Sequence, residues 1–100
     1  MSNEQIQKAI DFVQQHHDTI IDGYKQLLKF PSIGADPAYA DDVKQCAEWI
    51  VSELTRIGFD NAQVIPTAGH PVVYADWLHA GDDKLTVLVY AHYDVQPVDP

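Results

Sequence analysis

The sequence predicts an α/β fold in which two N-terminal helices are followed by a mixed β-sheet. Apolar residues recur every three or four positions over residues 3–57, which is the period of one helical face. Short stretches rich in β-branched and aromatic residues then follow, as is typical of strands. One of them, "LTVLVYA" (85–91), is almost continuously apolar. Such a run indicates a strand buried on both faces, near the centre of a sheet covered by helices.

The first helix is expected over residues 3–30. Ser2 and Gln5 have the spacing of a capping box, which satisfies free N–H groups at the start of a helix. Gly23 weakens the middle of this helix and allows a bend. Pro31 disfavours helical geometry at the residue before it, so the helix is expected to end there.

The second helix is expected to begin near Asp36, which can cap it, with Pro37 in its first turn. Its apolar face steps by four and three through Val43, Ala47, Ile50, Leu54 and Ile57. Gly58 supplies a left-handed residue just past the end, where Phe59 can pack back on the last turn.

Three strands are expected after this helix: "NAQVIPT" (61–67), "PVVYADWL" (71–78) and "LTVLVYAHYD" (85–94). The turn "HAGDDK" (79–84) separates the second from the third, because Gly81 and the two aspartates suit turn geometry. Helices followed by strands in a short chain indicate one layered α/β domain.

Composition excludes several classes of function. One hundred residues allow one small domain. The net charge of −9 argues against a nucleic-acid or membrane surface, since both need basic patches. Cys46 is the single cysteine, so no disulfide framework can form, and its helical surroundings predict a buried small side chain. The N-terminus lacks the pattern of a secretory signal, so a cytoplasmic protein is expected.

His92 and Asp94 carry the chemical interest, because they lie at the carboxyl end of the third expected strand. Ligands of open α/β sheets bind outside this end, and side chains two apart on a strand point the same way. An imidazole that binds a metal usually donates its other N–H to a carboxylate. Asp94 could orient His92 in this manner or bridge to the ion itself. An ordinary hydrogen bond at a sheet edge explains the pair equally well.

Other polar residues have structural explanations. His16 and His17 are neighbours on a helix and point about 100° apart, so they cannot chelate together. His79 adjoins the turn and is expected to be exposed. Asp82 and Asp83 are explained by turn chemistry without a metal.

The longer context resembles a known family. The stretches "LLKFPSIGADP", "VSELTRIGF", "GHPVVYADW" and "TVLVYAHYDVQPVDP" cover nearly the whole chain. They resemble the N-terminal part of the zinc exopeptidase family that includes carnosinase, cytosolic non-specific dipeptidase, aminoacylase and succinyl-diaminopimelate desuccinylase. The "GHPVVYADW" and "VQPVDP" details resemble the dipeptidase branch. The resemblance implies that residues 1–100 begin a larger layered zinc-peptidase catalytic domain, with any dimerisation or lid domain outside this chain.

The resemblance also implies a chemistry. His92 matches the first metal ligand of the family, and Asp94 matches the carboxylate that orients it, which we take as a catalytic residue. The family enzymes hold zinc, more often two ions than one, and hydrolyse a dipeptide or an N-acyl amino acid with metal-activated water. His70 lies within a matching stretch, so a role near the site stays open.

In the family, the other ligands and the general base lie further along the chain. A catalytic zinc typically has three protein ligands, so we expect the 100-residue chain to be an inactive fragment of a dipeptidase. The assembly of the parent, including a homodimer, is left open. The fragment is expected to fold marginally or to associate, because its buried strand needs partners.

Two alternatives remain. The chain could be a small non-catalytic α/β module in which His92 and Asp94 are only hydrogen-bonded to each other. It could also be a metal-free hydrolase that uses a His–Asp pair, although no Ser or Cys nucleophile lies in a recognisable elbow motif.

Overall fold

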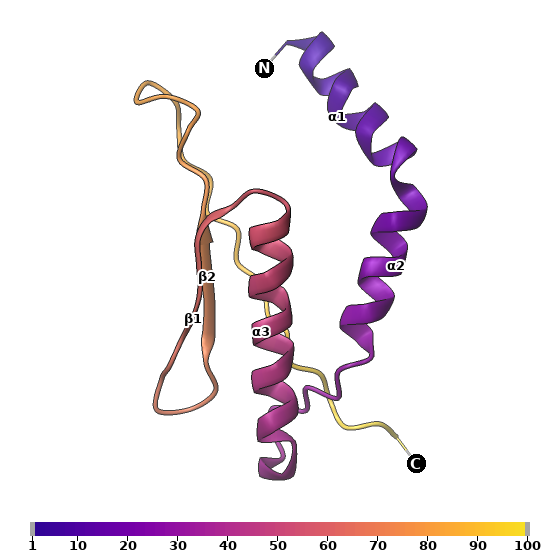
Figure 1. Cartoon of the computed structure of the whole chain (residues 1–100), viewed down its shortest axis with the longest axis vertical. Coiled ribbons are helices and arrows are strands. Elements are labelled where there is room, and N and C mark those ends of the chain that lie inside the picture. Colours follow the sequence, from indigo (N-terminus) through magenta and orange to yellow (C-terminus); the bar gives the residue numbers. More distant parts are fainter. Residues whose placement is uncertain (1, 100) are drawn as a thin grey trace.

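The computed structural model describes residues 2–99 and shows an α/β arrangement, as the sequence predicts (Figure 1). The elements in chain order are α1 (Asn3–Gln15), α2 (His17–Leu28), the short 3-10 helix η1 (Pro37–Tyr39), α3 (Ala40–Arg56), β1 (Asp60–Ile65) and β2 (Val72–Asp76). The two strands form a hairpin that packs along α3, and α2 lies on the other side of α3 (Figure 1). No helix among the described residues is long and apolar enough to span a membrane.

The first expected helix is two helices, broken at His16. The capping box of Ser2 and Gln5 is present, so the predicted start is confirmed. The bend expected at Gly23 occurs instead at His16, whose backbone leaves helical geometry at φ −108° and ψ 15°. Its ring stacks on Phe12, and its Nδ1 lies 2.8 Å from the Phe12 carbonyl oxygen. The Phe12 carbonyl thus lies close to both the backbone N–H and the ring of His16 at the position of the break.

The start and end of α3 follow the sequence closely. The Asp36 carboxylate accepts the backbone N–H of Ala38 at 2.9 Å, so it caps η1, the short turn that leads into α3. At the other end Gly58 has φ +101°. The N–H groups of Gly58 and Phe59 donate to the carbonyls of Thr55 and Leu54. This is a Schellman motif, in which a left-handed residue satisfies the last carbonyls of a helix.

The core is small and lies on the side of α3 that faces the loop after α2. Val43, Cys46 and Ala47 of α3 are buried, together with Ser32 and Ile33 of that loop. The loop also meets the end of the chain, since Ile33 and Val95 form an isolated parallel bridge. The burial of Cys46 confirms its predicted role as a packed small side chain.

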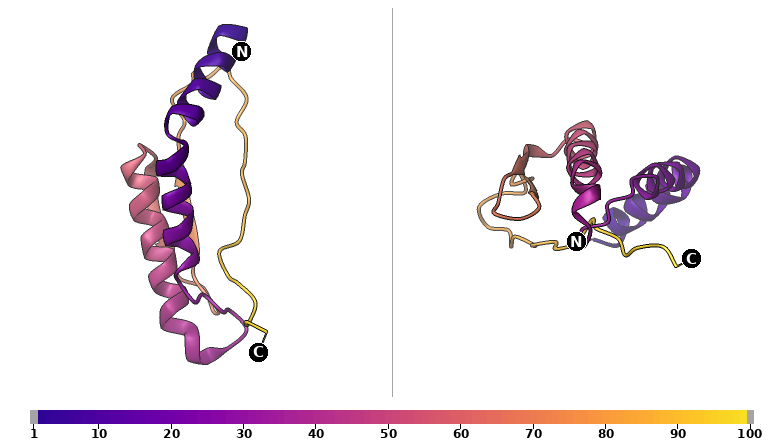
Figure 2. Two further views of the ribbon diagram at one scale, coloured as in Figure 1. Left: turned by 90° about the vertical axis from the view of Figure 1, so that its right-hand side faces the viewer. Right: turned by 90° about the horizontal axis from the view of Figure 1, so that it is seen from below.

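The prediction of a third strand over residues 85–94 is wrong for this structure. β1 and β2 pair antiparallel, and residues 85–94 run past them as an extended trace without joining the sheet (Figure 2). No backbone hydrogen bond within residues 2–99 joins 85–94 to another segment. The side chains of Leu85 and Leu88 are 97% and 89% exposed. The apolar pattern of residues 85–94 indicates burial on both faces. A strand also needs backbone hydrogen-bonding partners on its edges, and the two-stranded sheet of this structure does not supply them.

The sheet is therefore antiparallel, and the only parallel pairing in the described part of the chain is the Ile33–Val95 bridge. This bridge fixes the position of residues 93–95, and so it helps to position His92 and Asp94.

Candidate functional site

His92 and Asp94 lie side by side, as the sequence predicts, although no strand holds them. His92 Nδ1 is 2.9 Å from Asp94 Oδ1 and 3.1 Å from the Asp94 carbonyl oxygen. Both oxygens can only accept, so the proton of a neutral imidazole is on Nδ1. His92 Nε2 then carries a free lone pair, and no hydrogen bond within residues 2–99 uses it. The imidazole is 79% exposed, so this lone pair is accessible.

Backbone contacts hold the segment that carries this pair. The N–H of Val95 donates to the Ser32 carbonyl at 2.9 Å, and the Ser32 hydroxyl donates to the Tyr93 carbonyl at 2.7 Å. Ser32 is only 1% exposed, so these two bonds are shielded from water. The residues on either side of Asp94 are thus anchored to the loop after α2.

Gly34, two residues further along that loop, lies against the Asp94 side chain. A Cβ placed on Gly34 would be 3.2 Å from Asp94 Cβ and 3.4 Å from Asp94 Oδ2. The one carboxylate oxygen therefore faces His92, and the other faces the backbone of Gly34.

His70 joins this cluster from the loop between the two strands. Its Nε2 lies 2.7 Å from the Gly34 carbonyl oxygen and donates to it. Its Cδ2 would be 3.6 Å from the same Cβ on Gly34. The sequence left the place of His70 open. The structure brings it to the loop that contacts Asp94, through a contact between residues 36 positions apart that no local pattern encodes.

Tyr93 fixes the segment from its other side. Its hydroxyl donates to the Pro71 carbonyl, next to His70. Burial raises the pKa of the Tyr93 phenol, and the nearby groups of Cys46 and Asp94 raise it further when they are charged. Burial likewise raises the pKa of the Cys46 thiol, with the Ser32 hydroxyl acting in the opposite direction. A neutral buried thiol is a poor nucleophile, so Cys46 is not a catalytic candidate.

Another histidine–carboxylate pair lies elsewhere. His79 Nε2 bonds to the Asp60 carboxylate, linking the chain after β2 to the start of β1, and both side chains are about half exposed. Sequence reasoning missed this pair, although the hairpin register, which sets Asp60 opposite Asp76, brings residue 79 close. It supplies a useful comparison for His92 and Asp94.

The donors of the candidate site fit part of a metal's coordination shell. The His92 ring is in the tautomer whose Nε2 can bind a metal. The Asp94 oxygen that does not bond to His92, Oδ2, lies beside Gly34. A catalytic zinc usually takes three protein ligands. Residues 2–99 contain no group of three His, Cys, Asp or Glu side chains arranged to hold an ion.

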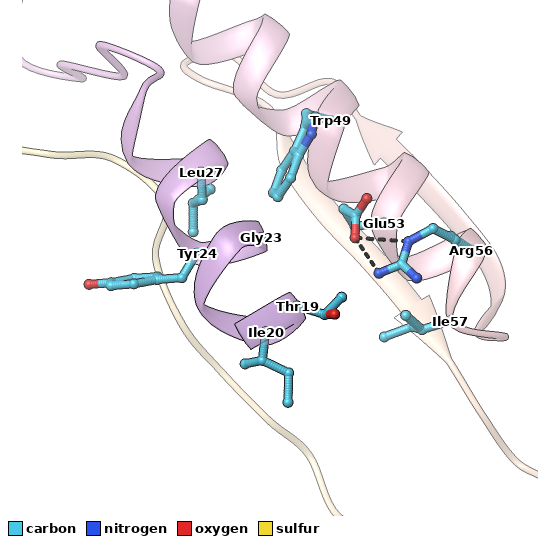
Figure 3. Close-up of a pocket in the computed structure, with 9 residues that line it drawn as sticks. All are labelled: Thr19, Ile20, Gly23, Tyr24, Leu27, Trp49, Glu53, Arg56 and Ile57. Carbon is cyan, nitrogen blue, oxygen red and sulfur yellow. Dashed lines mark hydrogen bonds and ion pairs between the residues drawn. The ribbon is translucent and has the colours of Figure 1, made fainter. Parts of the chain in front are cut away.

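A separate hollow lies between α2 and α3 and has a volume of about 270 Å³ (Figure 3). Its walls include Leu27 of α2 and Trp49 of α3, and neither His92 nor Asp94 lines it. The charged groups in its wall, Glu53 and Arg56, neutralise each other at 2.7 Å, and the hydrogen bond from Arg56 lowers the pKa of Glu53. We regard this hollow as a gap between loosely packed helices.

Curated proteins with similar sequences are dipeptidases. A Cys-Gly metallodipeptidase of Candida albicans is 31% identical over 103 residues, which cover 92% of this chain and 21% of that protein. The Cys-Gly metallodipeptidase of Schizosaccharomyces pombe is 28% identical over the same shares. A cysteinylglycine-S-conjugate dipeptidase of Corynebacterium striatum is 26% identical over 97% of this chain. The chain is related to metallodipeptidases.

This finding supports the sequence-based resemblance at the level of metallodipeptidases, without separating the branches of the wider exopeptidase family. The name metallodipeptidase implies a metal but does not say which one. The chain spans about a fifth of the length of these dipeptidase relatives. No family model matches the chain, and no solved structure matches it significantly.

Proposed function

We propose that this chain is the N-terminal part of the catalytic domain of a zinc-dependent dipeptidase, with His92 as a metal ligand. One observation carries the proposal. Asp94 accepts the Nδ1–H of His92 and leaves Nε2 free and exposed, in a chain related to metallodipeptidases. Carboxylate–histidine pairs of this form are the usual support of metal-binding imidazoles.

Each residue has a defined task in this proposal. His92 donates its Nε2 lone pair to the metal. Asp94 keeps the proton on Nδ1, sets the orientation of the ring and raises the basicity of Nε2. Bound zinc supplies the activation of water and the polarisation of the scissile carbonyl. The parent enzyme is proposed to hold two zinc ions, with the further ligands and the general base outside this chain.

The proposed substrates are dipeptides, with N-acyl amino acids as the wider class. The relatives are named for Cys-Gly and for cysteinylglycine S-conjugates, so Cys-Gly is the first dipeptide to assay. A single cysteine fits a reducing compartment, and we propose that the parent enzyme is cytoplasmic. We also propose that the parent enzyme is a homodimer. The 100-residue chain by itself is expected to be inactive, because His92 and Asp94 offer fewer donors than a catalytic zinc requires.

Zinc titration of the 100-residue chain, followed by NMR of its histidine rings, tests the proposal. Zinc chloride is expected to shift the His92 ring signals selectively. His92→Ala should abolish zinc binding by the chain. His79→Ala is the matched control, because His79 belongs to a second partly exposed histidine–aspartate pair that bonds through Nε2. Equal zinc responses at His79 and His92, or binding that survives His92→Ala, would contradict the assignment of His92.

The expected inactivity needs its own assay. The purified 100-residue chain with added zinc should not hydrolyse Cys-Gly above the background of the His92→Ala variant. Hydrolysis that a chelator abolishes would show that this chain is a complete catalyst. The non-catalytic module remains the second candidate, since residues 2–99 contain no three-ligand group. A His92 ring that is indifferent to zinc would favour that module.

A further inference from the structure

We propose that Gly34 and His70 are positioning residues, which hold the Asp94 carboxylate so that His92 keeps its proton on Nδ1. The purpose of this arrangement rests on the function proposed above, whereas its structural effect can be measured without any metal. We call the Gly34–His70–Asp94 contact the latch.

The steric part of the latch is the missing side chain of Gly34. A Cβ there would approach Asp94 Cβ to 3.2 Å, closer than the optimal separation of about 3.5–4.0 Å between carbon atoms, and it would touch Asp94 Oδ2 at 3.4 Å. Gly34 is not among the glycines with positive φ in the described chain. Its lack of a side chain is therefore needed for space and not for backbone conformation. A methyl group would therefore require the Asp94 side chain to shift by a few tenths of an ångström.

The second part is the hydrogen bond from His70 to the Gly34 carbonyl at 2.7 Å. This bond ties the loop after α2 to the residue that precedes Pro71 and β2. A neighbouring bond closes the ring of contacts, because the Tyr93 hydroxyl donates to the Pro71 carbonyl. Three segments distant in sequence thus meet around Asp94, and the Gly34 backbone cannot easily withdraw from it.

The remaining freedom of Asp94 is limited from both sides. Ser32 anchors the carbonyl of Tyr93 and the N–H of Val95, so the backbone on either side of Asp94 is fixed. Oδ2 faces Gly34, and Oδ1 is left to face His92 Nδ1 at 2.9 Å. A neutral imidazole without such a partner can carry its proton on either nitrogen. The Asp94 carbonyl oxygen, 3.1 Å from Nδ1, favours the same tautomer. The latch adds the carboxylate as the closer acceptor and so strengthens the preference for the tautomer that exposes the Nε2 lone pair.

The test compares Gly34→Ala with Gly23→Ala in the 100-residue chain. Gly23 is the matched control, because a Cβ there meets nothing within 4 Å. The fraction of the Nδ1–H tautomer of His92 is read from ring ¹⁵N chemical shifts at a pH well above about 6.5, where an ordinary imidazole is neutral. We expect wild type and Gly23→Ala to be mainly Nδ1–H, and Gly34→Ala to gain the Nε2–H form several-fold.

His70 variants keep the proposal testable if Gly34→Ala fails to fold. His70→Ala should lose Nδ1–H selection, while His70→Gln should restore much of it, because a Gln amide can donate to the Gly34 carbonyl. A tautomer that is unchanged in Gly34→Ala and His70→Ala would overturn the latch, as would equal effects of His70→Ala and His70→Gln.

Zinc titration separates the latch from the proposed function. If both hold, Gly34→Ala should bind zinc at His92 about 10–100-fold more weakly than Gly23→Ala does, the usual cost of losing the support of a ligand. A tautomer change without any zinc response at His92 would leave the latch standing and refute the metal-ligand proposal. Zinc binding at His92 with no tautomer change would refute the latch alone.

Discussion

The Tyr93 hydroxyl donates a hydrogen bond to the carbonyl oxygen of Pro71, across 22 positions of the sequence. Tyr93 lies between His92 and Asp94, so this bond holds the segment of the candidate site against the residue that precedes β2. The His92 side chain is largely exposed and that of Asp94 is half exposed, and the partly buried phenol anchors the residue between them. The Tyr93 bond therefore holds the backbone next to His92 in place and leaves the imidazole accessible.

Tyr93→Phe should destabilise the folded chain by about 1 kcal/mol, the typical net value of one hydrogen bond. The substitution keeps the ring and leaves the Pro71 carbonyl without its protein partner. Urea unfolding followed by circular dichroism measures the change. Tyr74→Phe is the control, because its hydroxyl bonds to Asp76 on an exposed surface, and a change within about 0.5 kcal/mol is expected there. Equal effects of the two variants would show that the Tyr93 bond is no stronger than a surface contact.

Stability should fall as the pH rises into the alkaline range. Burial raises the pKa of Cys46, and burial with nearby charges raises that of Tyr93. The folded chain therefore holds protons that the unfolded chain has begun to release. This contribution is fully present below the unfolded-state pKa values, about 8.5 for Cys and about 10 for Tyr. It is lost as the pH rises through the folded-state values.

Urea midpoints measured at several pH values between about 8 and about 11 test this dependence. Cys46→Ala should remove the earlier part of the decline. Tyr93→Phe should reduce the later part, to which Tyr74 also contributes because its hydrogen bond to Asp76 raises its pKa. A stability curve that is flat across this range in wild type would contradict both raised pKa values.

Two glycine-to-alanine substitutions should act in opposite directions. Gly58 has φ +101° at the end of α3, and alanine in this region costs about 1–2 kcal/mol. No atom lies within 4 Å of the added Cβ at either Gly58 or Gly23, so crowding contributes to neither effect. Gly23 lies inside α2, where alanine is favoured by about 1 kcal/mol. Thermal unfolding should show a lower midpoint for Gly58→Ala and a higher one for Gly23→Ala.

Features that depend on neighbouring residues could be predicted from the sequence. The capping box of Ser2 and Gln5 and the left-handed Gly58 are confirmed, because each requires only a few adjacent residues. The contact between His92 and Asp94 is also local. Its two partners are two positions apart.

Features that depend on distant partners were missed or misassigned. The hydrogen bond between His70 and Gly34 joins separate loops, and no periodicity encodes it. Residues 85–94 have the composition of a strand, but a strand also needs hydrogen-bonding partners on its edges. The break at His16 coincides with the contact of its ring with the preceding turn, which an apolar period does not reveal.

The 100-residue chain should associate with further copies of itself through residues 85–91. This segment contains no charged residue, no proline and no glycine, and Val87 and Val89 are 82% and 84% exposed. Extended, uncharged segments with free backbone groups pair readily with one another. Val87→Lys should therefore reduce the associated fraction seen in sedimentation velocity, without loss of stability, because the valine has few contacts to lose.

Gln14→Lys is the matched control for this prediction. It changes the net charge by the same amount at an exposed position on α1, and it leaves the apolar segment intact. Association should persist in Gln14→Lys and decrease in Val87→Lys, since a lysine in the segment opposes close pairing of identical strands through like-charge repulsion. If both variants reduce association equally, overall charge governs the association. If wild type sediments as a monomer at all concentrations tested, the exposed segment does not mediate self-association.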